Sequence, residues 1–318
     1  CDWSSDVCSS DLGKCDRPVR RIRILPCVDL VGGETPFVVH VPPPDVVTQQ
    51  ATPDSRSGQA RRGQRAGVSA RRMNEYARPM PGRIALVGSG EYLPVMHDVE
   101  AWLLENRPPV FVQLATAAAP EGQYSLDYWR QLGADAAHRL GVEQVFVDVR
   151  TPADADDPRF AAIIRGAGAI YFSGGNPTFL ARTLTGSAVL DAVITEWRAG
   201  ASLGGCSAGA MAIGGYIPNL RHLRVGGTDG FGIVPNVRVL PHFDRYSSWI
   251  PNFAAHLLVS ESHHVVGIDE ETALVAEAQH HDEWEFRSFG RQSTWLISGE
   301  GPQAISDIRL RVAHVTGL

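Results

Sequence analysis

The sequence predicts a three-layer α/β protein with a mainly parallel sheet, and three observations support this fold class. Short apolar runs that end in glycine alternate with amphipathic stretches long enough to form helices. The composition, 44% hydrophobic and 20% charged residues, is that of a globular protein able to bury a core. Beyond residue 211 the helical period fades and short β-like runs remain, which predict antiparallel additions near the C-terminal end.

The parallel part of the sheet is expected to contain five buried strands separated by helices. The strands are expected within residues 83–90, 109–117, 142–149, 169–175 and 201–209, and the helices within 95–106, 125–141, 158–168 and 177–200. This alternation is typical of right-handed crossover connections. Later β-like runs, at residues 238–243, 264–269, 272–278, 283–289 and 293–298, are expected to extend the sheet and to add an antiparallel edge.

The first 79 residues do not follow this pattern. Residues 2–12, DWSSDVCSSDL, read as an in-frame translation of a sequencing adapter, so we interpret residues 1–12 as a library artefact; sequencing the native locus would test this. Residues 13–79 are rich in Pro, Gly, Ser, Gln and Arg, and we interpret them as a disordered or non-native extension. The folded domain is therefore expected at residues 80–318.

Charge and cysteine content limit the partners and the compartment. A net charge of −6 gives no electrostatic reason to expect binding to nucleic acid or to an anionic membrane. No apolar run approaches the roughly 18 residues that a membrane-spanning helix needs. Cys206 is the one cysteine beyond residue 27, which fits a reducing compartment, so a cytoplasmic protein is expected. The sequence does not distinguish a monomer from a homodimer.

The strongest chemical motif is Gly-Cys-Ser-Ala-Gly at residues 205–209, at the end of a predicted strand and the start of a predicted helix. It fits the G-x-S-x-G elbow, in which a sharp turn between small residues projects a serine hydroxyl clear of the sheet. Ser207 is thus the candidate nucleophile, with the amide of Ala208 placed to meet a developing oxyanion. The alternative is a packing turn with a buried serine.

The turn FSGGNP, residues 172–177, could supply a second oxyanion donor. Gly174 and Gly175 allow close backbone approach, and their amides precede a helix N-terminus, which favours a negatively charged oxygen. Asn176 and Pro177 are also explained simply as the N-cap and the first residue of that helix.

A hydroxyl nucleophile needs a general base, usually a histidine held by a carboxylate. His242 ends a β-like run, whereas His263 and His264 stand at a strand entrance, where solvation is the simpler reading. Three adjacent acids, Asp269, Glu270 and Glu271, follow a short apolar strand, and the pattern alone prefers none of them.

A rival arrangement uses Cys206 with the pair His281 and Glu283, as in triad-type glutamine amidotransferases. Two observations weigh against it. A cysteine-centred elbow would need glycine at position 208, which is alanine. The segment around His281 is strongly polar and is typical of a solvated hairpin tip.

The ordered segments FSGGNPTFL, GCSAGAM, LPHFD and GIDEETAL together resemble the peptidase E and cyanophycinase family of serine peptidases, over about residues 83–296. The resemblance implies a class I glutamine amidotransferase-like (flavodoxin-like) fold and no metal or organic cofactor. It implies Ser207 as nucleophile, His242 as base and Glu270 as its acidic partner. The implied oxyanion donors are the amides of Gly175 and Ala208.

The same resemblance implies a small peptide substrate with an aspartyl group. Arg245, three residues after His242, could bind its carboxylate, or could be a surface ion-pair partner, and Asn176 is a second candidate contact. The segment HFDRYSSWIPNF lacks the Arg-rich continuation expected of cyanophycinases, and GGNP lacks their polar residue after the glycines. The alternatives are hydrolysis of Asp-Arg polymer fragments, a Cys206-based amidase, and a catalytically silent binding module of the same fold.

Overall fold

The computed structural model describes residues 80–219, 226–246, 263–280 and 282–313, all of which belong to one compact unit of the chain. The interpretations of residues 1–12 and 13–79 concern a part of the chain outside the described residues. Within the described part, no helix is both long enough and apolar enough to cross a membrane.

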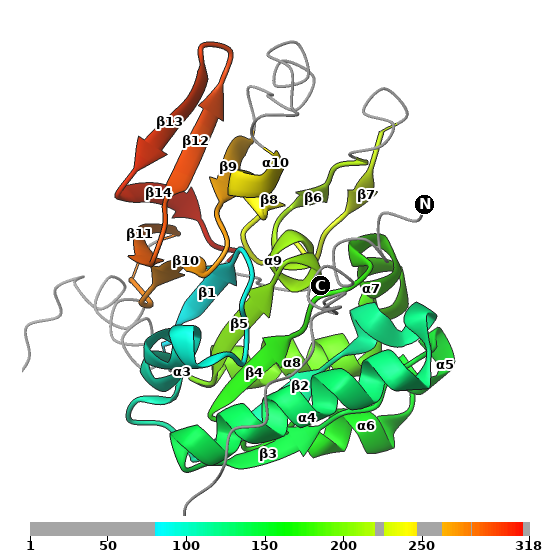
Figure 1. Ribbon diagram of the computed structural model, residues 1–318. Helices are drawn as coiled ribbons and strands as arrows, with labels where there is room; N and C mark the ends of the chain where they lie inside the picture. Colours follow the sequence, from blue (N-terminus) through cyan, green and yellow to red (C-terminus); the bar gives the residue numbers. More distant parts are fainter. Residues whose placement is uncertain (1–79, 220–225, 247–262, 281, 314–318) are drawn as a thin grey trace, which may run out of the picture. The chain divides into compact units, whose positions relative to one another are not determined.

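An eight-stranded sheet forms the centre of the domain (Figure 1). Its strand order is β14-β11-β10-β1-β5-β4-β2-β3. The strands are β1 Ile84–Val87, β2 Val110–Leu114, β3 Glu143–Phe146, β4 Ala169–Phe172, β5 Ser202–Cys206, β10 Thr272–Ala276, β11 Glu283–Gly290 and β14 Asp307–Arg311. The first five are parallel to one another, and the last three add antiparallel pairs beside β1. The predicted fold class is confirmed.

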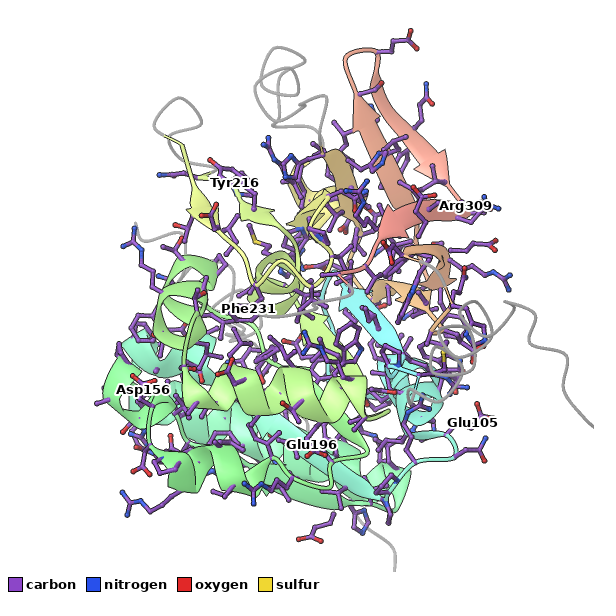
Figure 2. The ribbon with its side chains drawn as sticks, turned by 180° about the vertical axis from the view of Figure 1, so that it is seen from behind. Glu105, Asp156, Glu196, Tyr216, Phe231 and Arg309 are labelled. Atoms are coloured by element: carbon purple, nitrogen blue, oxygen red, sulfur yellow. The ribbon has the colours of Figure 1, made fainter. Side chains whose placement is uncertain are left out.

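Helices cover both faces of this sheet. Alternate residues of β1 enter different clusters: Ala85 and Val87 pack toward α3 and α4, whereas Ile84 and Leu86 pack toward the opposite layer. Seen from behind, α8 lies across that opposite layer, with Glu196 near its C-terminal end (Figure 2). The helices are α3 His97–Leu104, α4 Gln123–Leu140, α5 Pro152–Ala155, α6 Pro158–Ile163, α7 Pro177–Leu184, α8 Ala188–Arg198 and α9 Ala208–Ile213.

The helix expected over residues 177–200 is two helices, α7 and α8. The break lies at Gly186, whose φ of 73° is left-handed, and Ser187 then caps α8 by accepting the Leu190 N–H at 3.2 Å. A glycine followed by a capping serine inside a helical pattern is a stop and a start signal. The apolar period continues across the break and conceals it in the sequence.

Four of the later strands form a second sheet, in the order β13-β12-β9-β8, instead of all extending the first. These strands are β8 Val237–Pro241, β9 His264–Ile268, β12 Thr294–Ser298 and β13 Gly301–Ile305. The expectation that residues 238–243, 264–269 and 293–298 join the main sheet is therefore wrong. The physical reason is that their backbone hydrogen bonds are made among themselves: β8 pairs with β9 in parallel, and β9 and β13 pair with the two sides of β12.

Shorter elements complete the described part. They are the 3-10 turns η1 Pro94–Met96 and η2 Thr116–Glu121, the two-residue strands β6 Tyr216–Ile217 and β7 Thr228–Asp229, and the short helix α10 Phe243–Tyr246. The turn η2 and the helix α10 each follow a strand at its carboxyl end, β2 and β8 respectively.

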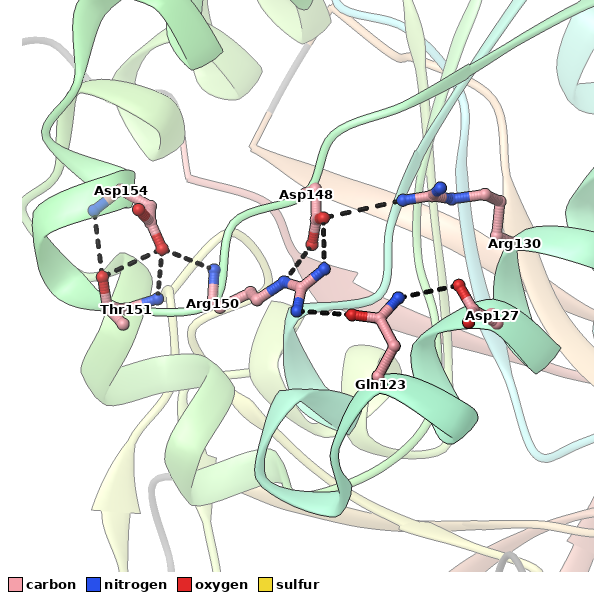
Figure 3. A network of polar contacts seen from close by, with 7 residues as sticks. All are labelled: Gln123, Asp127, Arg130, Asp148, Arg150, Thr151 and Asp154. Atoms are coloured by element: carbon pink, nitrogen blue, oxygen red, sulfur yellow. Dashed lines mark hydrogen bonds and ion pairs between the residues drawn. The ribbon is translucent and has the colours of Figure 1, made fainter.

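A polar network joins the segment after β3 to the start of α4 (Figure 3). Arg150 donates to both carboxylate oxygens of Asp148, at 2.7 and 2.6 Å, and to Gln123 Oε1 at 2.8 Å. Thr151 and Asp154 then form a capping box that begins α5. Because Arg150 and Asp148 are partly exposed, these contacts fix the loop more than they stabilise the domain.

Gly209 allows α9 to lie directly against β4. A Cβ atom at this position would stand 2.3 Å from the Phe172 carbonyl oxygen. We expect Gly209→Ala to lower the free energy of unfolding by about 3 kcal/mol or more, since backbone would have to move. Gly186→Ala is the control. Its new Cβ atom would meet no atom within 4 Å, so the cost is only that of an alanine at a left-handed φ, about 1–2 kcal/mol. Urea unfolding of both variants measures the difference, and equal losses would contradict it.

Glu100 on α3 is a buried carboxyl whose Oε1 accepts the Tyr92 N–H at 2.7 Å. Burial raises its pKa to about 8. Between an unfolded pKa of about 4.3 and this value the folded state binds the extra proton, so its contribution to stability falls as pH rises. We expect Glu100→Gln to remove this loss, so that its unfolding free energy relative to wild type increases from pH 5 to pH 8. Urea titrations at several pH values measure this, and a pH-independent difference would contradict it.

Candidate active site

The segment 205–209 forms a sharp turn from β5 into α9. Ser207 has φ 49° and ψ −107°, a conformation that side-chain-bearing residues rarely adopt, and its amide donates to the Val87 carbonyl at 2.9 Å. A Cβ atom on Gly205 would stand 2.6 Å from the carbonyl carbon of Gly209. The turn therefore needs small residues on both sides of the serine, which is the reason for the G-x-S-x-G spacing.

Ser207 hydrogen-bonds to a histidine from the second sheet. His242 follows β8, and its Nε2 lies 3.1 Å from Ser207 Oγ. The ring is largely buried, and the backbone of His242 also has a positive φ, 51°. The two residues are brought together because α9 packs against β8.

The other ring nitrogen of His242 contacts Glu270. Nδ1 lies 2.9 Å from Glu270 Oε1. The hydrogen bond to His242 is the main reason that the pKa of Glu270 lies below its usual value, with Arg245 adding to the effect. A carboxylate can only accept, so Nδ1 carries the proton and Nε2 of the neutral ring accepts the Ser207 hydroxyl. The arrangement can thus take a proton from Ser207.

Glu270 is held from two further directions. Its own amide donates to Asp244 Oδ1 at 2.9 Å, and the Arg245 Nε lies 2.8 Å from its Oε1. Both partners lie in α10, directly after His242. The segment HFDR therefore fixes both the His242 ring and the Glu270 carboxylate bonded to it.

The two acids beside Glu270 have other contacts. Asp269 is buried and accepts from the Trp295 indole at 2.9 Å and from the Ser293 amide at 3.2 Å. Glu271 pairs with Arg291 at 3.0 Å. Among these three acids, Glu270 alone is hydrogen-bonded to His242 in the described structure, so geometry distinguishes what the sequence pattern left open.

Ala208 follows Ser207 in the elbow, and Gly175 follows Gly174, where a Cβ atom would stand 3.7 Å from the Cβ of Ser207. Gly175 has φ 131°, and a Cβ atom there would stand 2.5 Å from the carbonyl carbon of Ala117, so the position requires glycine. Ala208 begins α9, where helix amides lack intrahelical acceptors. Neither amide donates a hydrogen bond to another described residue. Both are therefore able to bind an oxygen of a ligand.

Asn176 acts as the N-cap of α7, since its Oδ1 accepts the Phe179 N–H at 2.9 Å, and Pro177 follows as the first helical residue. The capping interpretation of this pair is thereby borne out by the hydrogen bond. A contact of Asn176 with substrate stays a prediction.

Cys206 is fully buried, in the cluster of aromatic side chains that includes Tyr92 and Tyr171. A thiol enclosed in this way cannot reach a substrate without local opening. His281, its proposed base, lies outside the described residues, and Glu283 begins β11.

Sequence reasoning missed one residue of this region, Glu91. It lies in the turn GSGEY after β1, it is buried, and its Oε1 accepts the Gly174 N–H at 3.0 Å. The available signal was its place at the carboxyl end of a strand, the edge where ligands gather in open α/β sheets.

Comparisons with known proteins identify the family of the chain. The model of peptidase family S51 matches residues 106–283. A crystal structure of a peptidase from an acI-B1 Actinobacterium is 40% identical, with a TM-score of 0.66, and the match covers 73% of this chain and 98% of that one.

The match to a crystal structure of a Listeria monocytogenes EGD-e protein described as peptidase E covers 67% of this chain and 100% of that one, at 17% identity and a TM-score of 0.47. No curated protein sequence gives a significant match. The family model and the 40% identical structure lead to one conclusion. The chain belongs to peptidase family S51 and is a serine-type peptidase.

Proposed function

We propose that the protein hydrolyses short peptides at an aspartyl residue, with Ser207 as nucleophile, His242 as general base and acid, and Glu270 as the group that orients the histidine. The observation that carries the proposal is the continuous hydrogen-bonded series from Ser207 Oγ to His242 to Glu270. The buried thiol of Cys206 disfavours the amidase alternative.

The proposed reaction has two stages, in which the acyl group of the substrate is transferred first to Ser207 and then to water. As Ser207 Oγ bonds to the peptide carbonyl carbon, His242 takes the hydroxyl proton, and the carbonyl oxygen becomes an oxyanion that the amides of Gly175 and Ala208 bind. When the C–N bond breaks, His242 returns that proton to the leaving amine. Water then attacks the acyl carbon and gives a proton to His242. When the bond between the acyl carbon and Ser207 Oγ breaks, His242 returns this proton to Oγ, which releases the acid product and restores the free enzyme.

The family resemblance suggests an aspartyl substrate, and Arg245 is the proposed contact for its carboxylate. Arg245 already pairs with Glu270 through Nε, and a guanidinium has further N–H donors in its fork. Its side chain is 48% exposed, so it can meet a ligand. Asn176 is the second proposed contact. Its Oδ1 caps α7, and the Nδ2 group of the same side chain would donate to the substrate.

We also propose that the protein is cytoplasmic. Cys206 is the single cysteine after residue 27, and a domain with one cysteine cannot form an internal disulfide, which fits a reducing compartment.

Substitution of the three residues tests the catalytic assignment in the full chain. We expect Ser207→Ala and His242→Ala to lower kcat on Asp-X dipeptides by about 10⁶-fold, and Glu270→Gln by about 10⁴-fold, because the three act as one unit. Cys206→Ala is the matched control and should keep most of the activity. Loss of activity with Cys206 and its retention without Ser207 would overturn the assignment. Parallel assays on Asp-Arg isopeptides and on glutamine separate the alternative substrates.

Substitution of Arg245 tests the substrate contact. Because a hydrogen bond to a charged group contributes about 1.5–3 kcal/mol, we expect Arg245→Ala to raise KM for Asp-X dipeptides by about tenfold or more. The KM for Ala-X dipeptides should change little. Loss of kcat by the same factor on both substrates would mean instead that Arg245 serves only to hold Glu270.

A further inference from the structure

The turn after β4, residues 173–176, carries the proposed oxyanion donor Gly175, and we call it the oxyanion turn. It contains two adjacent glycines, which leave the direction of its backbone undetermined. Glycine has the widest backbone freedom of any residue, so the sequence Gly174-Gly175 does not by itself fix the direction of the Gly175 N–H. A donor contributes to catalysis only if it is already aimed at the developing charge before reaction. External contacts must therefore orient this turn.

Two such contacts stand on either side of Gly175. On the C-terminal side, the Asn176 amide donates to the Ala117 carbonyl at 2.8 Å. On the N-terminal side, the Gly174 amide donates to Glu91 Oε1 at 3.0 Å. The first is a backbone contact that any sequence could make. The second depends on one side chain.

The Glu91 carboxyl lies next to the glycine turn and close to the elbow. A Cβ atom on Gly174 would stand 3.1 Å from Glu91 Oε1 and 3.7 Å from the Cβ of Ser207. Gly174 therefore lies between the carboxyl and the serine in space. Burial raises the pKa of this carboxyl, and such a group is retained in a core only when its hydrogen bonds compensate for its desolvation.

Neighbouring contacts hold the turn that carries Glu91. The Tyr92 hydroxyl lies 2.8 Å from Ser173 Oγ, the Tyr92 amide donates to Glu100, and Arg139 donates to the Tyr92 carbonyl. The segment after β1 is thus fixed independently of Gly174. It can serve as a rigid support for the oxyanion turn.

We propose that Glu91 is a positioning residue for the oxyanion site: by accepting the Gly174 N–H it sets the orientation of the Gly174-Gly175 peptide, whose N–H then binds the oxyanion. This rests on the proposed function of Ser207 and Gly175. Glu91 does not touch substrate in this account. It acts through the backbone of the glycine pair.

A fluorophosphonate tests the proposal without knowledge of the peptide substrate. In this reaction the Ser207 Oγ–P bond forms, the P–F bond breaks, fluoride leaves and His242 takes the proton, while the phosphoryl oxygen occupies the oxyanion site. We expect Glu91→Ala to lower the labelling rate by about 10²-fold, as for loss of one oxyanion donor. On Asp-X dipeptides kcat should fall by a similar factor, with KM changed less than about threefold. Glu91→Gln should recover labelling to within about fivefold of wild type, because its amide oxygen still accepts the Gly174 N–H.

Ser187→Ala is the matched control, because Ser187 is another buried side chain that accepts a backbone N–H, that of Leu190. Its hydroxyl caps α8 and takes no part in the contacts that hold Glu91 or Gly174 in the described structure. We expect this variant to lose thermal stability and to keep its labelling rate within about threefold. Wild-type labelling of Glu91→Ala, equal slowing in Ser187→Ala, or failure of Glu91→Gln to recover would each overturn the proposal. Ser207→Ala is measured in parallel: labelling of that variant at the wild-type rate would refute the proposed nucleophile instead.

Discussion

The left-handed backbone of Ser207 is the constraint on which the site depends. A side-chain-bearing residue at φ 49° and ψ −107° costs on the order of 1–3 kcal/mol, so the surrounding packing must hold it there. All six residues of α9 are buried, and Gly209 lets that helix lie against the backbone of β4. The burial that anchors α9 thereby maintains the turn that exposes the Ser207 hydroxyl.

Positive backbone φ angles also occur at or beside the two partners of Ser207. His242 has a positive φ at the end of β8, and Glu270 is followed by Glu271 at φ 55°. The turn that contains Glu270 connects β9 of the second sheet to β10 of the first, and β8 pairs with β9 in parallel. The second sheet thus delivers histidine and carboxylate together to an elbow built by the first. Asp244 and Arg245 tie these two segments to each other.

The features that could be predicted from the sequence are those that depend on residues close together in the chain. The elbow around Ser207, the cap at Asn176 and the strand-helix alternation are of this kind. Choosing Glu270 over its acidic neighbours needed the family resemblance, because the contacts that separate them come from Trp295 and Arg291, distant in sequence.

The second sheet and Glu91 were not predicted for the same physical reason. Strand periodicity shows that a segment is extended but not which edge it joins, and β8 and β9 found their partners in each other and in β12. Glu91 contacts a glycine 83 residues away, and a single glutamate in a turn carries no local sign of burial. Only the fold shows that its carboxyl accepts the Gly174 N–H.

We expect an acyl-enzyme to form on Ser207, and mass spectrometry of the trapped intermediate tests this most directly. An activated aspartyl ester mixed with the enzyme and quenched in acid should leave one aspartyl group on the peptide that contains residues 205–211, attached at Ser207. Fragmentation that instead locates the group on Cys206, or turnover of the ester with no covalent adduct at any time, would contradict the account.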